Sequence, residues 1–392
     1  MKIQSAWHSK LFAAVNRLFR VEQLLQISPL FFITLFSIVS ISLCLLYSAG
    51  SGPSPWCVRQ LIHFALGVVI MLITATTPIR LWYNLAYVMY AAALCALALT
   101  ALLGTVGMGA QRWLKIASIQ FQPSEIMRIA LVVALARRFS DVPLALPHLA
   151  PPNNRTATSQ ARAMCVPLAL IAIPVFITVK QPDLGTAMLL CASGGALFFF
   201  AGIRMRFILS VIGGAISGFP IFWHFLHDYQ KNRILTFLNP ERDPLGSGYH
   251  IIQSKIAIGS GGFWGKGFMR GTQGALDFLP EKHTDFIFTL LSEEFGFIGV
   301  ALLVALYSAL IFFNLLLSVS LKDEFARLVI TGMTISFALY AIINIAMVAG
   351  LLPVVGIPLP LVSYGGTSMI TLLISQGIIL SAAFGRAKKR GA

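Results

Sequence analysis

The chain has 392 residues, of which 57% are hydrophobic and only 11% carry a charge. A soluble domain usually has about a quarter of its residues charged, so this composition excludes an ordinary soluble protein. Continuous apolar runs of about 20 residues predict membrane-spanning helices, and they exclude the short alternating strands of a membrane β-barrel. We therefore predict an all-α polytopic integral membrane protein that forms a single domain over residues 1–392.

The net charge of +15 comes from 29 Lys and Arg residues against 14 Asp and Glu residues. Residues 1–27 carry Lys2, Lys10, Arg17 and Arg20, and the apolar run that follows has no small-residue cleavage site. This pattern predicts a cytoplasmic basic tail before a first span, in preference to a cleaved signal peptide. The five cysteines show no CxxC spacing, so neither a disulfide framework nor a metal site is expected. No basic and aromatic platform indicates nucleic-acid binding.

We predict about ten transmembrane helices, at residues 28–49, 58–77, 81–103, 123–139, 163–180, 184–202, 207–226, 285–317, 328–350 and 364–384. The basic residues of the short loops place both termini in the cytoplasm. Residues 141–162, rich in Pro and Asn, are predicted to be a cytoplasmic connector. Residues 227–284 then form one long extracytoplasmic loop between spans seven and eight.

The first motif with chemical potential runs from Gly107 to Arg128. Pro123 suits a first helical turn, and Glu125 then lies near the positive end of the helix dipole. Glu125 and Arg128 are three residues apart and can pair on one helix face. An ordinary helix start with a local ion pair is one interpretation, but an Arg at membrane depth usually has a function. Arg112 and Lys115 add positive charge where lipid phosphates lie.

The next motif is the turn at 180–186, where Pro and Gly explain the turn and Asp183 can cap the following helix. Within the long loop, residues 249–258 look like an amphipathic helix at the membrane surface. The glycine-rich residues 259–271 follow, and their backbone N–H groups can converge on an anion with Lys266 and Arg270 as charge partners. An ordinary glycine-rich loop is the alternative.

The long loop contains seven basic residues: Lys231, Arg233, Arg242, Lys255, Lys266, Arg270 and Lys282. Outer loops normally avoid Lys and Arg, so this concentration points to an anionic partner. Long loops also cross the membrane regardless of their charge, and the composition alone does not choose between these interpretations.

Asp285 follows Thr284 at the start of span eight, which places its carboxylate near the outer headgroup level. Thr284 is a plausible N-cap, and from the residues alone the favoured interpretation is a first-turn acid that stabilises the helix dipole. Residues 353–368 contain three prolines and three glycines in an apolar context. Irregular backbone at membrane depth must pack on protein or line a cavity, so we predict a cavity wall with Ser363 and Tyr364 exposed to it.

Six motifs occur in order along nearly the whole chain: GAQRWL at 109–114, FQPSE at 121–125, QPDLGT at 181–186, DPLGSGYHIIQSKIAIGSGG at 243–262, LPEKHTDFIF at 279–288 and GIPLPLVSYGG at 356–366. Together they resemble the SEDS family (shape, elongation, division and sporulation), and most of all its elongation branch. The resemblance implies a peptidoglycan glycosyltransferase of the bacterial cytoplasmic (inner) membrane that polymerises lipid II. It also implies a class B penicillin-binding protein and other membrane proteins of the elongation machinery as partners.

The resemblance assigns the catalytic role to Asp285 and maps the charged residues of the family's cavity onto Glu125 and Arg128. Members of the family commonly have Lys where this chain has Arg128, whose guanidinium makes a broader, planar contact. The candidate substrate-binding residues are Arg112, Lys115, Glu125, Arg128, Asp183, Lys266, His283, Ser363 and Tyr364. A divalent cation, Mg²⁺ or Mn²⁺, can share the stabilisation of pyrophosphate, although no metal-ligand spacing demonstrates it. A lipid II flippase and a noncatalytic scaffold are the alternative functions.

Overall fold

The computed structural model describes residues 29–107, 110–116, 119–142, 157–203, 209–210, 213–214, 217–218, 220, 223–224, 228–243, 246–275 and 281–390. The helices are α2 (Pro29–Ala49), α3 (Pro55–Thr76), α4 (Ile79–Leu103), α5 (Pro123–Asp141), α6 (Ala157–Lys180), α7 (Leu184–Phe200), α9 (Asp228–Leu238), η1 (Pro240–Arg242), α10 (Ser247–Gly261), α11 (Thr272–Ala275), α12 (Ile287–Val319), α13 (Glu324–Val348) and α14 (Gly366–Arg390). The strands are β1 (Thr105–Gly107), β2 (Ala110–Ile116) and β3 (Ile119–Phe121).

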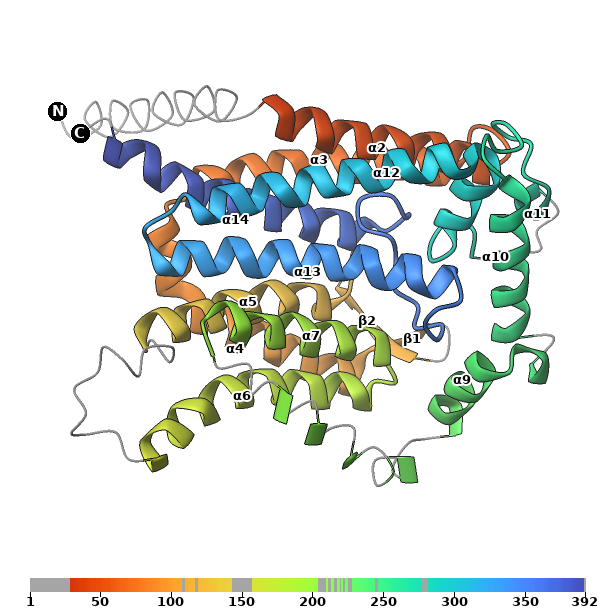
Figure 1. Ribbon diagram of the computed structural model, residues 1–392. Coiled ribbons are helices and arrows are strands. Elements are labelled where there is room, and N and C mark those ends of the chain that lie inside the picture. Colours follow the sequence, from red (N-terminus) through yellow and green to blue (C-terminus); the bar gives the residue numbers. More distant parts are fainter. Residues whose placement is uncertain are drawn as a thin grey trace.

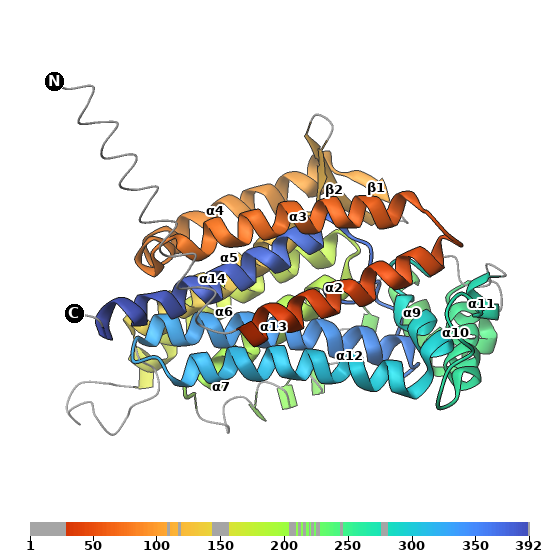
Figure 2. The same ribbon diagram turned by 90° about the horizontal axis from the view of Figure 1, so that it is seen from above.

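The long helices run side by side as one bundle, and α10 lies across one end of it (Figure 1). Viewed from above, α9, α10 and α11 gather at that same end (Figure 2). By length and composition six described helices can cross a membrane, namely α2, α3, α4, α12, α13 and α14. The predicted helical membrane fold is therefore confirmed. The number of spans stays a prediction, because span 207–226 and tail 1–27 fall largely or wholly outside the described residues.

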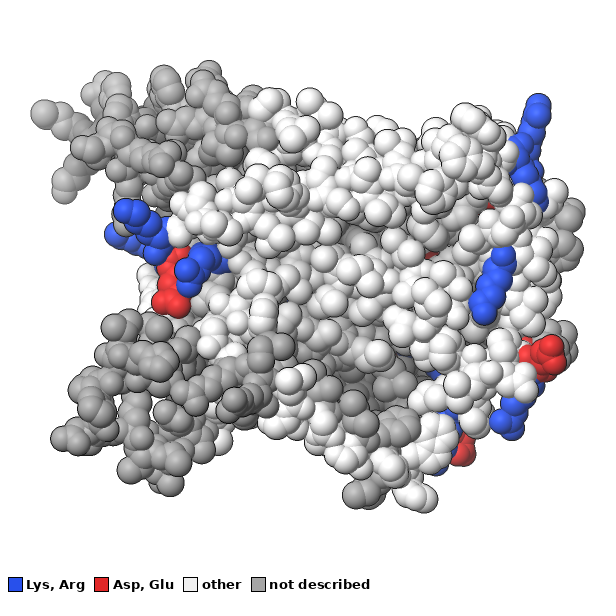
Figure 3. All heavy atoms as spheres, in the orientation of Figure 1, with Lys and Arg blue, Asp and Glu red and all other residues white. Residues whose placement is uncertain are grey.

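The surface agrees with a membrane protein. On the face shown in Figure 3, Lys, Arg, Asp and Glu side chains lie at the two ends of the bundle, with an uncharged band between them. Large apolar side chains are exposed on the long helices, among them Leu302 and Phe312 of α12 and Ile342 of α13. Such a surface is stable against lipid tails and would be unusual against water.

Three local predictions need correction. The three strands form an antiparallel sheet in the order β1-β2-β3, which the all-α prediction omitted. Helix α6 begins at Ala157, so the end of the predicted connector 141–162 is helical, and residues 143–156 lie outside the described part. The long loop 227–284 contains α9 and α11, which the prediction omitted, whereas the helix predicted at residues 249–258 is confirmed within α10.

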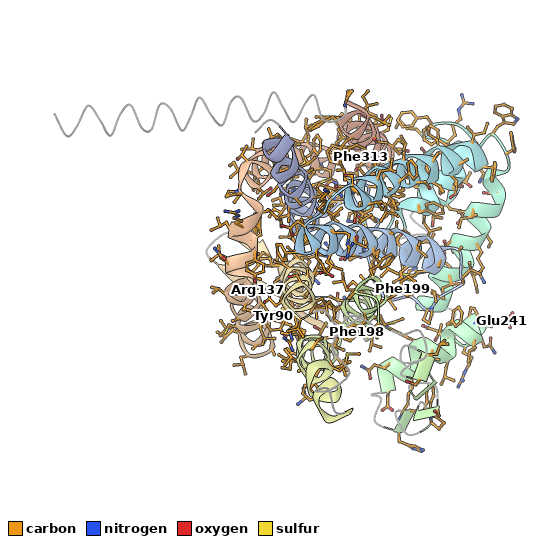
Figure 4. All side chains as sticks on the ribbon, turned by 60° about the vertical axis from the view of Figure 1, so that its left-hand side comes forward. Tyr90, Arg137, Phe198, Phe199, Glu241 and Phe313 are labelled. Atoms are coloured by element: carbon orange, nitrogen blue, oxygen red, sulfur yellow. The ribbon has the colours of Figure 1, made fainter. Side chains whose placement is uncertain are left out.

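The core consists of two clusters of buried apolar side chains on either side of the bundle. One contains Phe31, whose ring lies 5.6 Å from that of Phe313, and the other contains Phe139, 5.2 Å from Phe198. Phe313 and Phe198 lie in opposite parts of the molecule in Figure 4. Between the clusters, α13 has most of its residues buried, so its few polar side chains must find partners inside the protein.

Helix α12 is kinked at Gly296, whose φ of 61° is outside the helical region. A Cβ at this position would lie 2.3 Å from the amide nitrogen of Gly265. The kink therefore exists because the loop after α10 packs backbone to backbone against α12, which requires glycine on both sides.

Candidate functional site

Asp285 lies in a turn directly before α12, which begins at Ile287. The Thr284 hydroxyl donates to the Glu281 carboxylate at 2.6 Å and makes no bond that caps the helix. The interpretation of Asp285 as a first-turn acid behind a Thr284 cap is therefore wrong, because the chain makes one more turn before entering the helix. Asp285 is partly exposed as a residue, and among the described residues none donates a hydrogen bond to its carboxylate.

Three consecutive backbone carbonyls at this turn each accept a hydrogen bond from the C-terminal part of the chain. The acceptors belong to His283, Thr284 and Asp285, and the respective donors are the Tyr364 amide (2.9 Å), the Ser363 hydroxyl (2.6 Å) and the Asn344 side-chain amide (2.9 Å). The backbone is thus held from one side, whereas the Asp285 side chain remains free to meet a substrate.

Ser363 is buried, and its hydroxyl both donates to Thr284 and accepts from the Leu359 amide at 2.7 Å. The prediction that Ser363 faces a polar cavity is therefore wrong. Its hydroxyl is engaged by the backbone of Thr284 on one side and of Leu359 on the other. Tyr364 is partly accessible, as predicted.

The irregular segment predicted at residues 353–368 is confirmed over residues 353–365, which contain no helix or strand, whereas α14 begins at Gly366. Buried polar side chains from four different helices hydrogen-bond to the backbone of this segment. The donors are Ser42 to Val362 O (2.6 Å), Gln60 to Ser363 O (3.0 Å), Tyr307 to Pro360 O (2.6 Å) and Asn344 to Ile357 O (2.6 Å). These bonds meet the requirement that irregular backbone at membrane depth find its partners inside the protein.

Charges of both signs surround Asp285. Burial, followed by the negative charge of Glu281, raises the pKa of Asp285 to about 6, while the positive charges of Arg112 and Arg233 oppose the increase. Asp183 adds a smaller upward contribution to this pKa. A carboxyl group with such a pKa is mostly ionised near neutral pH and still a strong enough base to accept a proton.

Arg112 reaches this region from β2. A Cβ placed on Gly356 would lie 3.4 Å from Asp285 Oδ2 and 3.7 Å from Arg112 Nη1, so the guanidinium and the carboxylate lie beside the same glycine. Arg112 donates to Pro182 O at 3.1 Å and pairs with Asp183 at 3.5 Å. The absence of a side chain at Gly356, where φ is 69°, leaves the space between the two charged groups open.

Asp183 is the N-cap of α7, as predicted, and accepts from the Thr186 amide at 3.2 Å. Its other carboxylate oxygen accepts from the Thr186 hydroxyl at 2.8 Å and from Gln122 at 3.4 Å. A Cβ on Gly185 would meet Val355 O at 2.6 Å, so this turn packs closely on the irregular segment. Asp183 therefore fixes Arg112 beside Asp285 in addition to capping its own helix.

Glu125 and Arg128 form the predicted ion pair, at 3.0 Å, and both are buried within the bundle. Tyr340 donates to Glu125 at 2.6 Å, its ring lies 4.3 Å from the Arg128 guanidinium, and Thr371 donates to Glu125 at 3.3 Å. One nitrogen of Arg128, Nη1, is buried with no hydrogen-bond partner. A buried N–H donor of this kind is costly, and an anionic ligand would satisfy it.

The aromatic side chains next to Asp285 form a small stack. The His283 ring lies 4.4 Å from Trp56 at an interplanar angle of 10°, and 6.1 Å from the Tyr364 ring. Burial lowers the pKa of His283, which favours the neutral imidazole. All three rings are partly accessible.

The remaining two predicted substrate contacts are Lys266 and Lys115. Lys266 pairs with Glu293 at 2.7 Å at the kink of α12, so its charge is already neutralised within the protein. The amides of Lys266 and Gly267 donate to the carbonyls of Glu293 and Glu294. The prediction that the N–H groups of this loop converge on an anion is therefore wrong for these two amides. Lys115 is exposed on β2.

The sequence reasoning missed several residues of this region. Arg233 was noted only as part of the loop's charge, and Tyr340, Asn344 and Gln60 were not singled out. Asn344 and Gln60 are fully buried polar residues in apolar helices. That contrast was the available signal, because a buried amide in a membrane helix must have a partner.

Comparison with known proteins agrees with this geometry. Residues 22–388 match the family of FtsW, RodA and SpoVE, described as a cell cycle protein. The chain is 40% identical over 357 residues to the peptidoglycan glycosyltransferase MrdB of Escherichia coli K12, covering 91% of this chain and 93% of that protein. It is 39% identical over 354 residues to MrdB of Helicobacter pylori, covering 89% and 87%, respectively.

Solved structures show the same fold. A chain from a peptidoglycan synthase complex that coordinates polymerisation and crosslinking superposes with a TM-score of 0.76 at 30% identity, covering 91% of this chain and 97% of the other. The rod shape determining protein RodA of Thermus thermophilus gives a TM-score of 0.66 at 25% identity, covering 91% and 96%. With a family match across nearly its whole length, the chain belongs to the FtsW, RodA and SpoVE family of membrane proteins.

Proposed function

We propose that this protein is a peptidoglycan glycosyltransferase that polymerises lipid II into glycan strands for cell elongation and rod shape. The observation that carries the proposal is Asp285, a partly exposed residue whose carboxyl group has a pKa of about 6 and whose backbone is one of three consecutive carbonyls held by hydrogen bonds. The names of the similar proteins support the same activity.

In the proposed reaction, the 4-hydroxyl of the sugar on one lipid-linked molecule attacks C1 of another. The new bond joins that oxygen to C1, and the bond from C1 to the pyrophosphate oxygen breaks. Asp285 takes the hydroxyl proton, and undecaprenyl pyrophosphate leaves with the electron pair. The rings of Trp56, His283 and Tyr364 offer the sugar a surface beside this carboxylate.

Cations stabilise the negative charge that develops on the pyrophosphate. Arg112 lies beside Asp285, and Arg128 has the unpartnered buried N–H group that a phosphate oxygen would satisfy. Lys115 is exposed on the same strand as Arg112, three residues further along the chain. We assign Glu125, Tyr340 and Asp183 to holding the two arginines in place.

A requirement for Mg²⁺ or Mn²⁺ remains part of the proposal. Among the described residues no group of three or more His, Cys, Asp and Glu side chains is placed to hold a metal. A divalent ion would therefore be held chiefly by the pyrophosphate of the substrate, and it would add to the charge stabilisation that the arginines supply.

The proposed location is the bacterial inner membrane, with both termini cytoplasmic and α9 to α11 on the outer side. The proposed partner is a class B penicillin-binding protein that crosslinks the product. The support is the fold shared with a chain of a synthase complex that coordinates polymerisation and crosslinking. Other membrane proteins of the elongation machinery are further proposed partners.

The rival functions are a lipid II flippase and a noncatalytic scaffold. Flipping needs polar groups through the whole depth of the membrane. Here Asp285, Arg112 and Asp183 gather at the end that carries α10, and the Glu125–Arg128 pair lies in the first turns of α5, close to the same end. This placement favours chemistry at one surface.

The test is incubation of the purified protein with purified lipid II, with and without the class B partner, followed by gel separation of glycan strands. Polymer is the expected product. If lipid II binds but no condition gives polymer, the proposal is wrong. Movement of labelled lipid II across vesicle membranes would then identify a flippase, and its absence would favour the scaffold.

A further inference from the structure

The loop of residues 262–271 is fixed to the kink of α12. The amides of Lys266 and Gly267 donate to the carbonyls of Glu293 and Glu294 at 3.0 and 2.9 Å. These bonds, together with the Lys266–Glu293 ion pair, give the loop one position relative to the helix. The side chains on the outer face of the loop are therefore held in defined positions by the fold.

The side chains that this loop presents outward are apolar. Their exposed fractions are 57% for Phe263, 78% for Trp264, 42% for Phe268 and 42% for Met269. Two of the rings stack on spanning helices, Phe263 on Phe297 just after the kink of α12 (5.6 Å, 23°) and Phe268 on Tyr47 near the end of α2 (6.3 Å, 18°). The patch thus begins at the end of α2 and at the kink of α12.

The patch continues the lipid-facing surface. Phe297, Ile298 and Leu302 of α12 are exposed directly after the kink, on a helix long and apolar enough to span the membrane. Trp side chains are favoured at the boundary between lipid tails and headgroups. Arg270 is exposed in the same loop, where lipid phosphates would lie if the rings were inserted.

We propose that the 262–271 loop is an interfacial membrane anchor, with Trp264 inserted among the lipids of the leaflet at the α10 end of the bundle and Arg270 at the phosphate level. Insertion would hold α10 and α11 against the membrane surface, next to the turn that carries Asp285. The occupant of the patch is lipid, and a partner protein is the competing explanation. This inference does not depend on the catalytic activity.

The test measures Trp264 fluorescence in lipid nanodiscs without any partner. The chain has six Trp residues, so the contribution of Trp264 is the difference between the wild type and Trp264→Phe. Trp264→Tyr provides a second difference in case the first variant is unstable. Quenching is compared between lipids brominated near the glycerol end of the acyl chains, lipids brominated near the methyl end, and aqueous acrylamide. The difference for Trp56→Phe, a half-buried Trp stacked on His283, is the matched control.

The expected result is strong quenching of the Trp264 component by the glycerol-end bromolipid, weaker quenching by the methyl-end bromolipid, and shielding from acrylamide. Quenching by acrylamide with no response to either bromolipid would overturn the proposal. Shielding that develops only after the class B partner is added would also overturn it, in favour of a protein interface.

Discussion

At the scale of single residues, the proposed role of Asp285 as the base depends on the charges that face it. Burial and Glu281 raise its pKa to about 6, and Arg112 and Arg233 pull that pKa down. The balance leaves the carboxylate ionised at neutral pH yet basic enough to accept a hydroxyl proton. Because this pKa is raised in the folded protein, ionisation of the partly buried Asp285 destabilises the folded state.

We expect the rate of polymerisation to fall as the pH decreases through about 6, because protonated Asp285 cannot accept a proton. Arg112→Gln removes a positive charge that lowers this pKa, so the acid limb of kcat/KM should move to higher pH. Arg327→Gln is the control, since Arg327 is half-exposed and pairs with Glu324 at the opposite end of the bundle. An unchanged acid limb in Arg112→Gln would contradict this account of the site.

Asp285→Asn should stabilise the fold at neutral pH. The folded-state pKa is raised above the ordinary value of 3.8, so stability is lost as the pH rises between 3.8 and about 6. Removing the charge should raise the free energy of unfolding by at most about 3 kcal/mol. The gain should be smaller than this limit because solvent partly screens the group. Thermal unfolding in detergent should show a higher midpoint for Asp285→Asn at about pH 7 and little difference at about pH 4. A lower midpoint at neutral pH would argue against a desolvated carboxylate.

At the scale of elements, the site depends on buried side chains that tie separate segments together. Asn344 of α13 donates to both Asp285 O and Ile357 O, at 2.9 and 2.6 Å. This amide therefore joins the turn before α12 to the irregular segment. The irregular segment in turn meets the cap of α7, where Asp183 holds Arg112.

Asn344→Leu should reduce kcat by about tenfold or more, because two carbonyls lose their donor and the Asp285 carboxylate is no longer positioned, an effect of about 1–3 kcal/mol. The matched control is Asn314→Leu, which removes one buried hydrogen bond to Gln376 on the opposite side of α12's kink from the site. A similar loss of kcat in both variants would mean that Asn344 supports only folding. The readouts are kcat and the thermal midpoint of each variant.

Gly296→Ala should lower the thermal midpoint by several degrees. At a φ of 61° a side chain is strained, and the added Cβ would lie 2.3 Å from Gly265 N. Gly259→Ala is the control, since a Cβ there meets nothing within 4 Å and alanine favours the helix. Equal midpoints for Gly296→Ala and the wild type would show that the kink is not required.

The elements differ in how well the sequence predicts them. Local signals predict several helices, namely the apolar runs, Pro123 at the start of α5 and Asp183 at the cap of α7. The Glu125–Arg128 pair follows from helical spacing. Strands of three residues, such as β1 and β3, are too short for a periodic pattern, so the sheet was missed. An amide in an apolar helix indicates that Gln60 and Asn344 need buried partners, but it does not say which partners. The acceptor of Gln60 is Ser363 O, 303 residues away in the sequence, and no local pattern identifies it.

At the scale of the whole molecule, the bundle separates two tasks. The uncharged band holds the protein in the membrane, while the end with α9, α10 and α11 carries Asp285 and its charged neighbours (Figures 1 and 3). A lipid-linked substrate can keep its tail in the bilayer and place its sugars and phosphates at this end. The loop anchored by Trp264 would hold α10 and α11 against the membrane surface at this end.

The most direct test of the central claim is polymerisation of lipid II by the wild type and by Asp285→Ala, both purified and assayed with the class B partner. Thermal unfolding and binding of lipid II serve as controls that the variant is folded. We predict polymer from the wild type and none from a folded Asp285→Ala that still binds lipid II. Polymer at a comparable rate from Asp285→Ala would contradict the assignment of Asp285 as the base.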